Sequence, residues 1–292
     1  MKKKVLFILG TAHCGSTLLS LILDSSPQCF TVGELSNLPT IYSKYSKEKI
    51  ASQEQLNFWY LKFDREERRQ LTLGLSNKRI SAAIPLKVEK LVREIVGDPI
   101  FRPYSIIASK TSADVLIDST KTIYWISSML RLKELKQEFD VYLLHLVRDG
   151  RAVLNSYLRK RKRMTLEEIS NLWVQRVKNN EEFYHNFSQG NKIQIAYEKV
   201  ATKPQKTTQK ICDFLDIEFI PKMLDYWQHE HYMISGNQGT KSLIQKYQKD
   251  SCKSQDISIK LDLSWQTELT EDALKNFQKI VGDRNKPYEW NT

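Results

Sequence analysis

The first residues that could do chemistry form a glycine-bounded loop, Gly10-Thr-Ala-His-Cys-Gly15-Ser16-Thr17, between strand-forming residues and a helical pattern. Its spacing matches the P-loop, GxxxxGK followed by Ser or Thr, in which backbone N–H groups and the positive end of the next helix hold a phosphate. Ser16 stands where that motif has the lysine that reaches the β- and γ-phosphates of a nucleoside triphosphate. The loop predicts a phosphate site, and a glycine turn that binds nothing is the alternative.

A second group of residues suited to an anion follows the strongest strand pattern, in Leu146-Val-Arg148-Asp-Gly-Arg151. Arg148 is expected at the carboxyl end of that strand, where open α/β sheets bind their ligands. Ser156 lies about two helical turns further on and roughly on the same side. A forked guanidinium and a short hydroxyl suit a phosphate. The alternative is a solvated basic helix, because Arg159–Arg163 is a run of cations.

Alternating strand and helix patterns would position both groups. Short apolar runs at Val5–Leu9, Val115–Ile117, Val141–Val147 and Ile193–Ala196 predict buried strands, each followed by residues of helical character. Such alternation predicts an α/β fold with a mostly parallel sheet covered by helices on both faces.

The rest of the chain contains no convincing linker and no internal repeat. We therefore predict a single domain over residues 1–292, with a charged, helix-forming insertion over the sheet edge at residues 42–99. The polar stretch Gly236–Lys260 predicts a long loop. Four aromatic residues are predicted to belong to the core: Tyr124, Trp125, Trp173 and Trp227.

Composition limits the classes of partner and compartment. The chain of 292 residues has a formal net charge of +11, which favours an anionic partner. Its four cysteines include no CxxC pair, so neither a zinc site nor a disulfide framework is predicted, and a cytoplasmic location is the default. Lys2–Lys4 and the apolar run after them imitate a secretory signal, but Gly10 and His13 interrupt the pattern. No stretch approaches the roughly 20 apolar residues of a membrane span.

Both anion motifs resemble those of the sulfotransferase family, which is built on the P-loop fold. The loop around Gly10–Thr17 resembles the family's 5′-phosphosulfate-binding loop, and Arg148-Asp-x-Arg-x-x-x-x-Ser156 resembles its 3′-phosphate motif. Tyr197-Glu-Lys-Val, with the later Ile211–Ile217, is similar to a segment that follows these motifs. His231–Asn237 is similar to a loop of bacterial members. The resemblance implies a three-layer, P-loop-type sheet.

The resemblance also implies a donor and its contacts. The donor would be 3′-phosphoadenosine 5′-phosphosulfate, the product 3′,5′-bisphosphoadenosine, and no metal would take part. No nucleic-acid partner or stable membrane insertion is implied. The implied donor contacts are Gly10, Thr11, Ala12, His13, Cys14, Gly15, Ser16, Thr17, Arg148, Ser156, Tyr197, Asn237 and Lys241.

Three residues are implied to take part in the transfer reaction. Glu34 resembles the glutamate base of protein-tyrosine sulfotransferases, and Lys121 resembles a lysine that contacts the transferring group. A helix N-terminal acid and a surface lysine are the alternatives. His13 stands where many members have Lys or Arg. With a reference pKa of about 6.5, its charge would change near neutral pH, so the reaction rate is expected to vary between pH 6 and 8.

Specificity lies in loops, so the acceptor is left open among a peptide tyrosine, a carbohydrate and a metabolite, with acidic character favoured by the basic charge. The rival interpretation is a P-loop kinase or nucleotide-binding protein that uses ATP and magnesium, and Ser16 opposes it.

Overall fold

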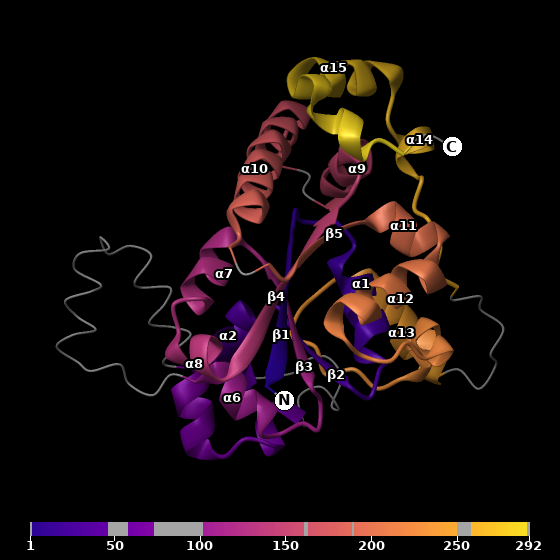
Figure 1. Cartoon of the computed structure of the whole chain (residues 1–292). Coiled ribbons are helices and arrows are strands. Elements are labelled where there is room, and N and C mark those ends of the chain that lie inside the picture. The colour runs from indigo at the N-terminus through magenta and orange to yellow at the C-terminus, as the bar shows by residue number, and fades with distance from the viewer. Residues whose placement is uncertain are drawn as a thin grey trace.

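The computed structural model describes residues 2–45, 58–72, 102–160, 163–188, 190–249 and 258–290. Its centre is a five-stranded parallel sheet in the order β2-β3-β1-β4-β5 (Figure 1). The four predicted strands are confirmed, and β2 adds a strand that was not predicted. The strands are β1 (Lys3–Gly10), β2 (Cys29–Gly33), β3 (Val115–Lys121), β4 (Phe139–Val147) and β5 (Lys192–Ala196).

The central strand shows why both faces of the sheet need a cover. Val5, Phe7 and Leu9 of β1 face one buried cluster, while Leu6 and Ile8 face another. Alternate residues of a strand point to opposite faces, so a strand that is apolar throughout must be buried on both. The predicted three-layer arrangement is therefore confirmed.

Helices supply the two outer layers and a third cluster beside the carboxyl end of β4 (Figure 1). The first layer contains η1 (Leu35–Asn37), α2 (Leu38–Tyr45), α6 (Pro103–Ala108), α7 (Ile123–Met129) and α8 (Lys133–Gln137). The opposite layer contains α1 (Ser16–Asp24), α11 (Tyr197–Thr202), α12 (Pro204–Leu215), η2 (Pro221–Gln228) and α13 (Gln238–Lys249). The third cluster contains α9 (Gly150–Lys160), α10 (Leu166–Asn186), α14 (Trp265–Glu268) and α15 (Glu271–Val281), and η3 (Gly282–Tyr288) follows α15.

The described part of the 42–99 segment lies beside the edge strand β2. Phe58 packs on Phe30 of β2 with ring centroids 5.0 Å apart, and the indole of Trp59 donates to the Tyr232 carbonyl at 2.5 Å. Residues 58–61 and 65–72 are helical. Most of the segment lies outside the described residues, so the insertion itself stays a prediction.

Two predictions were wrong. The stretch Gly236–Lys260 is not one long loop, because α13 occupies Gln238–Lys249 and buries Ile244 against the core around η2. One deeply buried apolar residue gave too weak a period to reveal that helix. Tyr124 is not a core residue, since 48% of it is exposed near the start of α7. Trp125 and Trp173 are buried as predicted, and Trp227 is half-buried.

No helix among the described residues is long and apolar enough to cross a bilayer.

Candidate active site

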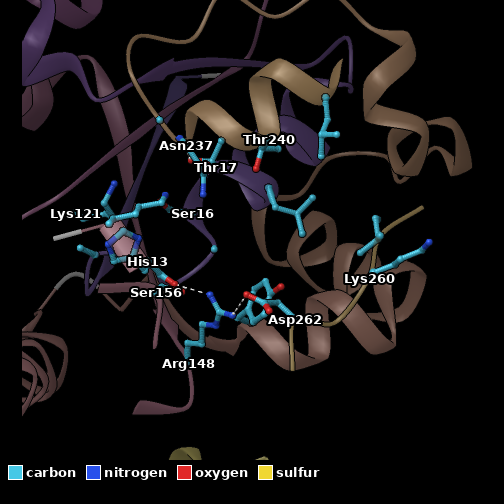
Figure 2. Close-up of a pocket in the computed structure, with 18 of the residues that line it drawn as sticks. His13, Ser16, Thr17, Lys121, Arg148, Ser156, Asn237, Thr240, Lys260 and Asp262 are labelled. Carbon is cyan, nitrogen blue, oxygen red and sulfur yellow. Dashed lines mark hydrogen bonds and ion pairs between the residues drawn. The ribbon is translucent and has the colours of Figure 1, made fainter. Parts of the chain in front are cut away.

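A pocket of about 570 Å³ opens at the carboxyl ends of β1, β3 and β4 (Figure 2). Ligand sites of open parallel sheets are expected at this edge. Stretches that are far apart in the sequence meet there, among them the loop after β1, the ends of β3 and β4, and the segment from η2 to residue 262. The predicted site residues that line the pocket are Ala12, His13, Gly15, Ser16, Thr17, Glu34, Lys121, Arg148, Ser156, Tyr197 and Asn237.

The loop after β1 has the form of a phosphate cradle. α1 begins at Ser16, directly after Gly15, whose φ of 92° favours glycine. A Cβ atom on Gly15 would lie 2.3 Å from the Tyr197 ring, so only glycine allows that ring to pack on the loop. The first amides of α1 lie at the positive end of the helix and suit an anion.

Other loop residues shape the turn from behind. Gly10 leaves room for the Cys14 sulfur, which would lie 2.8 Å from a Cβ at that position. Cys14 is fully buried, and burial raises its thiol pKa. Thr11 is also buried. None of these three residues lines the pocket, so their part in the cradle is to hold its backbone in place.

His13 occupies a left-handed backbone conformation, with φ of 63°. Its ring lies on the pocket wall and meets Tyr157 edge to face, with centroids 4.7 Å apart. Its carbonyl accepts a hydrogen bond from Nη1 of Arg148 at 2.8 Å. The phosphate loop and the end of β4 are thereby joined through one residue.

Arg148 is held on several sides (Figure 2). Besides the His13 carbonyl, it contacts Asp262, whose Oδ2 lies 3.0 Å from Nη2, and its guanidinium lies 4.2 Å from the centre of the Tyr197 ring. Burial acts to raise the pKa of Asp262, but hydrogen bonds from Ser264 and the charge of Arg148 outweigh it and bring the pKa to about 2. Asp262 is therefore ionised at neutral pH and fixes the guanidinium.

The other charged residues of the Arg-Asp-Gly-Arg motif are structural. Arg151 pairs with the buried Asp149 at 2.6 Å and lies over the Trp265 ring at 4.1 Å. Gly150 is tightly enclosed, because a Cβ there would lie 2.7 Å from Asn285 and 2.8 Å from Trp173. The motif thus fixes the start of α9, which carries Ser156 to the pocket wall.

The basic run after Ser156 is not wholly a solvated face. Arg159 and Lys160 line the pocket, and Arg159 lies 3.4 Å from Asp262 and 3.5 Å from Glu268. Residues 161 and 162 lie outside the described residues.

Glu34 and Lys121 meet as an ion pair, with Nζ 2.6 Å from Oε1. Lys121 has a φ of 69° just where β3 ends, and it also donates to the Ser119 carbonyl at 3.1 Å. The Asn37 side chain donates to the second oxygen of Glu34 at 3.0 Å. A carboxylate and an ammonium, each with a fixed neighbour, therefore face the pocket together.

The backbone before Glu34 depends on close contact with a distant loop. Gly33 forms an isolated parallel bridge with Ile234, and a Cβ on Gly33 would lie 2.2 Å from the Ile234 carbonyl oxygen. The Glu34 amide donates to the same oxygen at 2.8 Å. Glycine before the glutamate is required because this loop approaches so closely.

Asn237 and Lys241 differ in their placement. The backbone N–H of Asn237 donates to the Thr17 hydroxyl at 2.9 Å, and Asn237 lines the pocket. Lys241 does not line the pocket, because its buried Nζ donates to the Met233 carbonyl at 2.9 Å. Burial lowers the pKa of this ammonium to about 8. Lys241 therefore stabilises the loop that contains Met233 and does not face the pocket.

Sequence reasoning missed several residues of the site. Asn37 and Asp262 orient charged groups, and no local pattern signals them. An apolar wall also joins α1, η2, α13 and the segment near residue 259. It consists of Leu18, Tyr226, Leu243 and Ile259, beside the polar Thr240, Ser258 and Lys260.

Among the described residues, no group of three or more His, Cys, Asp or Glu side chains is arranged to hold a metal ion.

Known sulfotransferases are similar to this chain over almost its whole length. It is 22% identical over 284 residues to a putative protein-tyrosine sulfotransferase of Caenorhabditis briggsae, covering 96% of this chain and 86% of that one. The sulfotransferase domain of the Synechococcus PCC 7002 olefin synthase shares the fold with a TM-score of 0.56, at 19% identity over 100% of this chain and 98% of that one. The sulfotransferase domain of the curacin biosynthetic pathway does so with a TM-score of 0.54, at 19% identity over 99% of both chains.

The family model matches the part of the chain that holds most of the predicted site residues. The model described as the sulfotransferase family covers residues 6–221, from β1 to the start of η2. This range includes the phosphate loop, the Glu34–Lys121 pair and Arg148. The chain therefore belongs to the sulfotransferase family and is a sulfotransferase.

Proposed function

We propose that this sulfotransferase transfers a sulfuryl group from 3′-phosphoadenosine 5′-phosphosulfate to the hydroxyl of a peptide tyrosine. The observation that carries the proposal is the shared pocket, in which the Glu34–Lys121 pair lies with a phosphate loop and with Arg148. This arrangement offers a base, a cation for the transferred group and two anion sites.

The residues present fit the donor. The amides at the start of α1, with the hydroxyls of Ser16 and Thr17, hold the 5′-phosphate. Arg148 has five N–H donors, and its contacts with the His13 carbonyl and Asp262 leave two Nη hydrogens for the 3′-phosphate beside Ser156. The apolar wall accommodates the adenine.

Side chains of this protein perform the proton and charge work of the transfer. Glu34 takes the proton of the acceptor hydroxyl as its oxygen bonds to sulfur. The bond from sulfur to the phosphate oxygen breaks, and that oxygen keeps the electron pair. Lys121 stabilises the sulfuryl oxygens, and His13 donates to the leaving phosphate.

Two observations support a tyrosine acceptor with acidic neighbours. The Caenorhabditis briggsae relative is named a putative protein-tyrosine sulfotransferase. The net charge of +11 suits an acidic peptide better than a neutral metabolite.

The donor is tested by thermal unfolding with 3′,5′-bisphosphoadenosine and, separately, with ATP and magnesium. The bisphosphate at about 100 times its dissociation constant should stabilise the protein by about 2.7 kcal/mol. Arg148→Ala should weaken its binding about 100-fold, because it removes charge-assisted hydrogen bonds to a phosphate. Arg102→Ala, at an exposed arginine paired with Glu138, is the control. Stabilisation only by ATP with magnesium would reject the proposed donor and would favour the alternative of an ATP- and magnesium-using P-loop protein.

The acceptor is tested with labelled donor and three acceptors: a tyrosine peptide with acidic flanks, its phenylalanine counterpart and an oligosaccharide. Label on the tyrosine peptide alone is expected. Label on the oligosaccharide alone would move the acceptor class to carbohydrate.

A further inference from the structure

A second, small cavity of about 10 Å³ lies behind Arg148, between the end of β4 and α10. Arg148 lines both this cavity and the donor pocket. The other polar residues of its wall include Thr11, His145 and Trp173. The volume is at the lower limit of what one water molecule needs.

Three polar atoms that belong to this wall have no hydrogen-bond partner among the described protein atoms. They are Nδ1 of His145, Nε of Arg148 and Nε1 of Trp173. Leaving a buried donor or acceptor without a partner is costly, and native proteins seldom do so. Three such atoms around one small cavity indicate a common partner.

The chemistry of the three atoms specifies that partner. Arg148 Nε and Trp173 Nε1 can only donate. Gln194 hydrogen-bonds the His145 ring, and burial lowers the pKa of that ring to about 4, so the ring is neutral near pH 7. Nδ1 is the ring nitrogen without a partner, and it keeps a lone pair that accepts when Nε2 carries the hydrogen and donates it to the Gln194 side-chain oxygen.

One water molecule satisfies all three atoms. Its oxygen accepts from Arg148 and Trp173, and one of its hydrogens goes to His145. A metal cation would face two N–H donors, and an anion would face the imidazole lone pair. The volume excludes an organic ligand.

We propose that this cavity holds one ordered water, which ties the Nε side of Arg148 to His145 and Trp173. His145 and Trp173 then act as positioning residues, because they fix the guanidinium plane through the water. Their effect on 3′-phosphate binding rests on the function proposed above, whereas the water site does not.

The water itself is tested by a crystal structure of the unliganded protein at a resolution of about 1.5 Å or better. A density peak is expected at roughly 2.7–3.2 Å from all three nitrogen atoms. An empty cavity, or side chains turned to other partners, would overturn the proposal.

The positioning role is tested by comparing affinities for 3′,5′-bisphosphoadenosine and adenosine 5′-monophosphate. Trp173→Phe removes one donor to the water. It should weaken the affinity for the bisphosphate roughly 3- to 10-fold and leave the affinity for the monophosphate unchanged. His145→Phe, which removes the acceptor, should act in the same direction. Trp265→Phe changes another buried tryptophan of the same cluster and should leave the ratio unchanged.

A general loss of structure would weaken both nucleotides equally and would overturn the positioning role, as would unchanged affinities in both variants. If the unaltered protein binds the two nucleotides equally, the proposed 3′-phosphate site fails. The density test then still decides whether the water is present.

Discussion

The two ends of the pocket both hold a cation against a carboxylate, but they do so differently. At the transfer end, Lys121 and Glu34 are partly exposed, with 15% and 26% of their side chains accessible. At the Arg148 end, which we propose binds the 3′-phosphate, only 6% of the Arg148 side chain is accessible, and a carbonyl, a carboxylate and an aromatic ring surround it.

This difference matches two kinds of work. A side chain that only binds a ligand gives higher affinity when it is already fixed, because binding then costs less conformational entropy. A base and the cation beside it must exchange partners during the reaction, so they are paired mainly with each other. The comparison predicts rate effects at the Glu34 end and affinity effects at the Arg148 end.

The strongest test of the comparison is Glu34→Gln. Removing the base should lower kcat about 1,000-fold, within the range of general base catalysis, and leave bisphosphate affinity unchanged. Labelled-sulfate transfer and calorimetric titration measure the two quantities. A kcat within tenfold of the original would reject Glu34 as the base.

Lys241→Met sharpens the comparison by testing the support behind the transfer end. Burial lowers the Lys241 pKa from 10.5 to about 8, so the unfolded chain binds more protons between these values. Lys241 therefore contributes most to stability above pH 10.5, where it is neutral in both the folded and the unfolded protein. This contribution is lost as the pH falls through about 8, because the buried amine must then carry a charge. Relative to Lys241→Met, the original protein should gain about 3 kcal/mol of unfolding free energy from pH 8 to 10.5.

Urea unfolding at several pH values measures this gain, and Lys222→Met, at an exposed lysine of η2, controls for the loss of one lysine. Parallel pH profiles for the original protein and Lys241→Met would show that Lys241 is not desolvated in the fold.

Gly33→Ala tests whether the backbone at the transfer end needs its close contact. The methyl group would strike the Ile234 carbonyl at a φ of 71°, and we expect a loss of stability of about 2 kcal/mol or more. Gly190 has a φ of 70° with nothing within 4 Å, so Gly190→Ala isolates the backbone strain alone, about 1 kcal/mol. Equal losses in urea unfolding would mean that the Ile234 loop simply moves aside.

Strong local patterns made much of the fold predictable. Apolar runs revealed four strands, and the glycine spacing located the tight loop between β1 and α1. α13 was missed because its apolar side is narrow, and β2 because Thr31 and Gly33 interrupt the apolar residues of Cys29–Gly33. Tyr124 was misplaced because an aromatic residue near a helix start has no periodic signal for burial.

The sequence by itself determined the parallel sheet, the phosphate loop and the position of Arg148 at a strand end, since hydrophobic patterning and turn chemistry act over a few residues. Only the tertiary structure decided which charges meet. Lys121 and Glu34 are 87 positions apart, and Arg148 and Asp262 are 114 apart. The small cavity likewise joins β4 to α10. Such contacts depend on how helices pack on the sheet, and no local spacing in the chain encodes them.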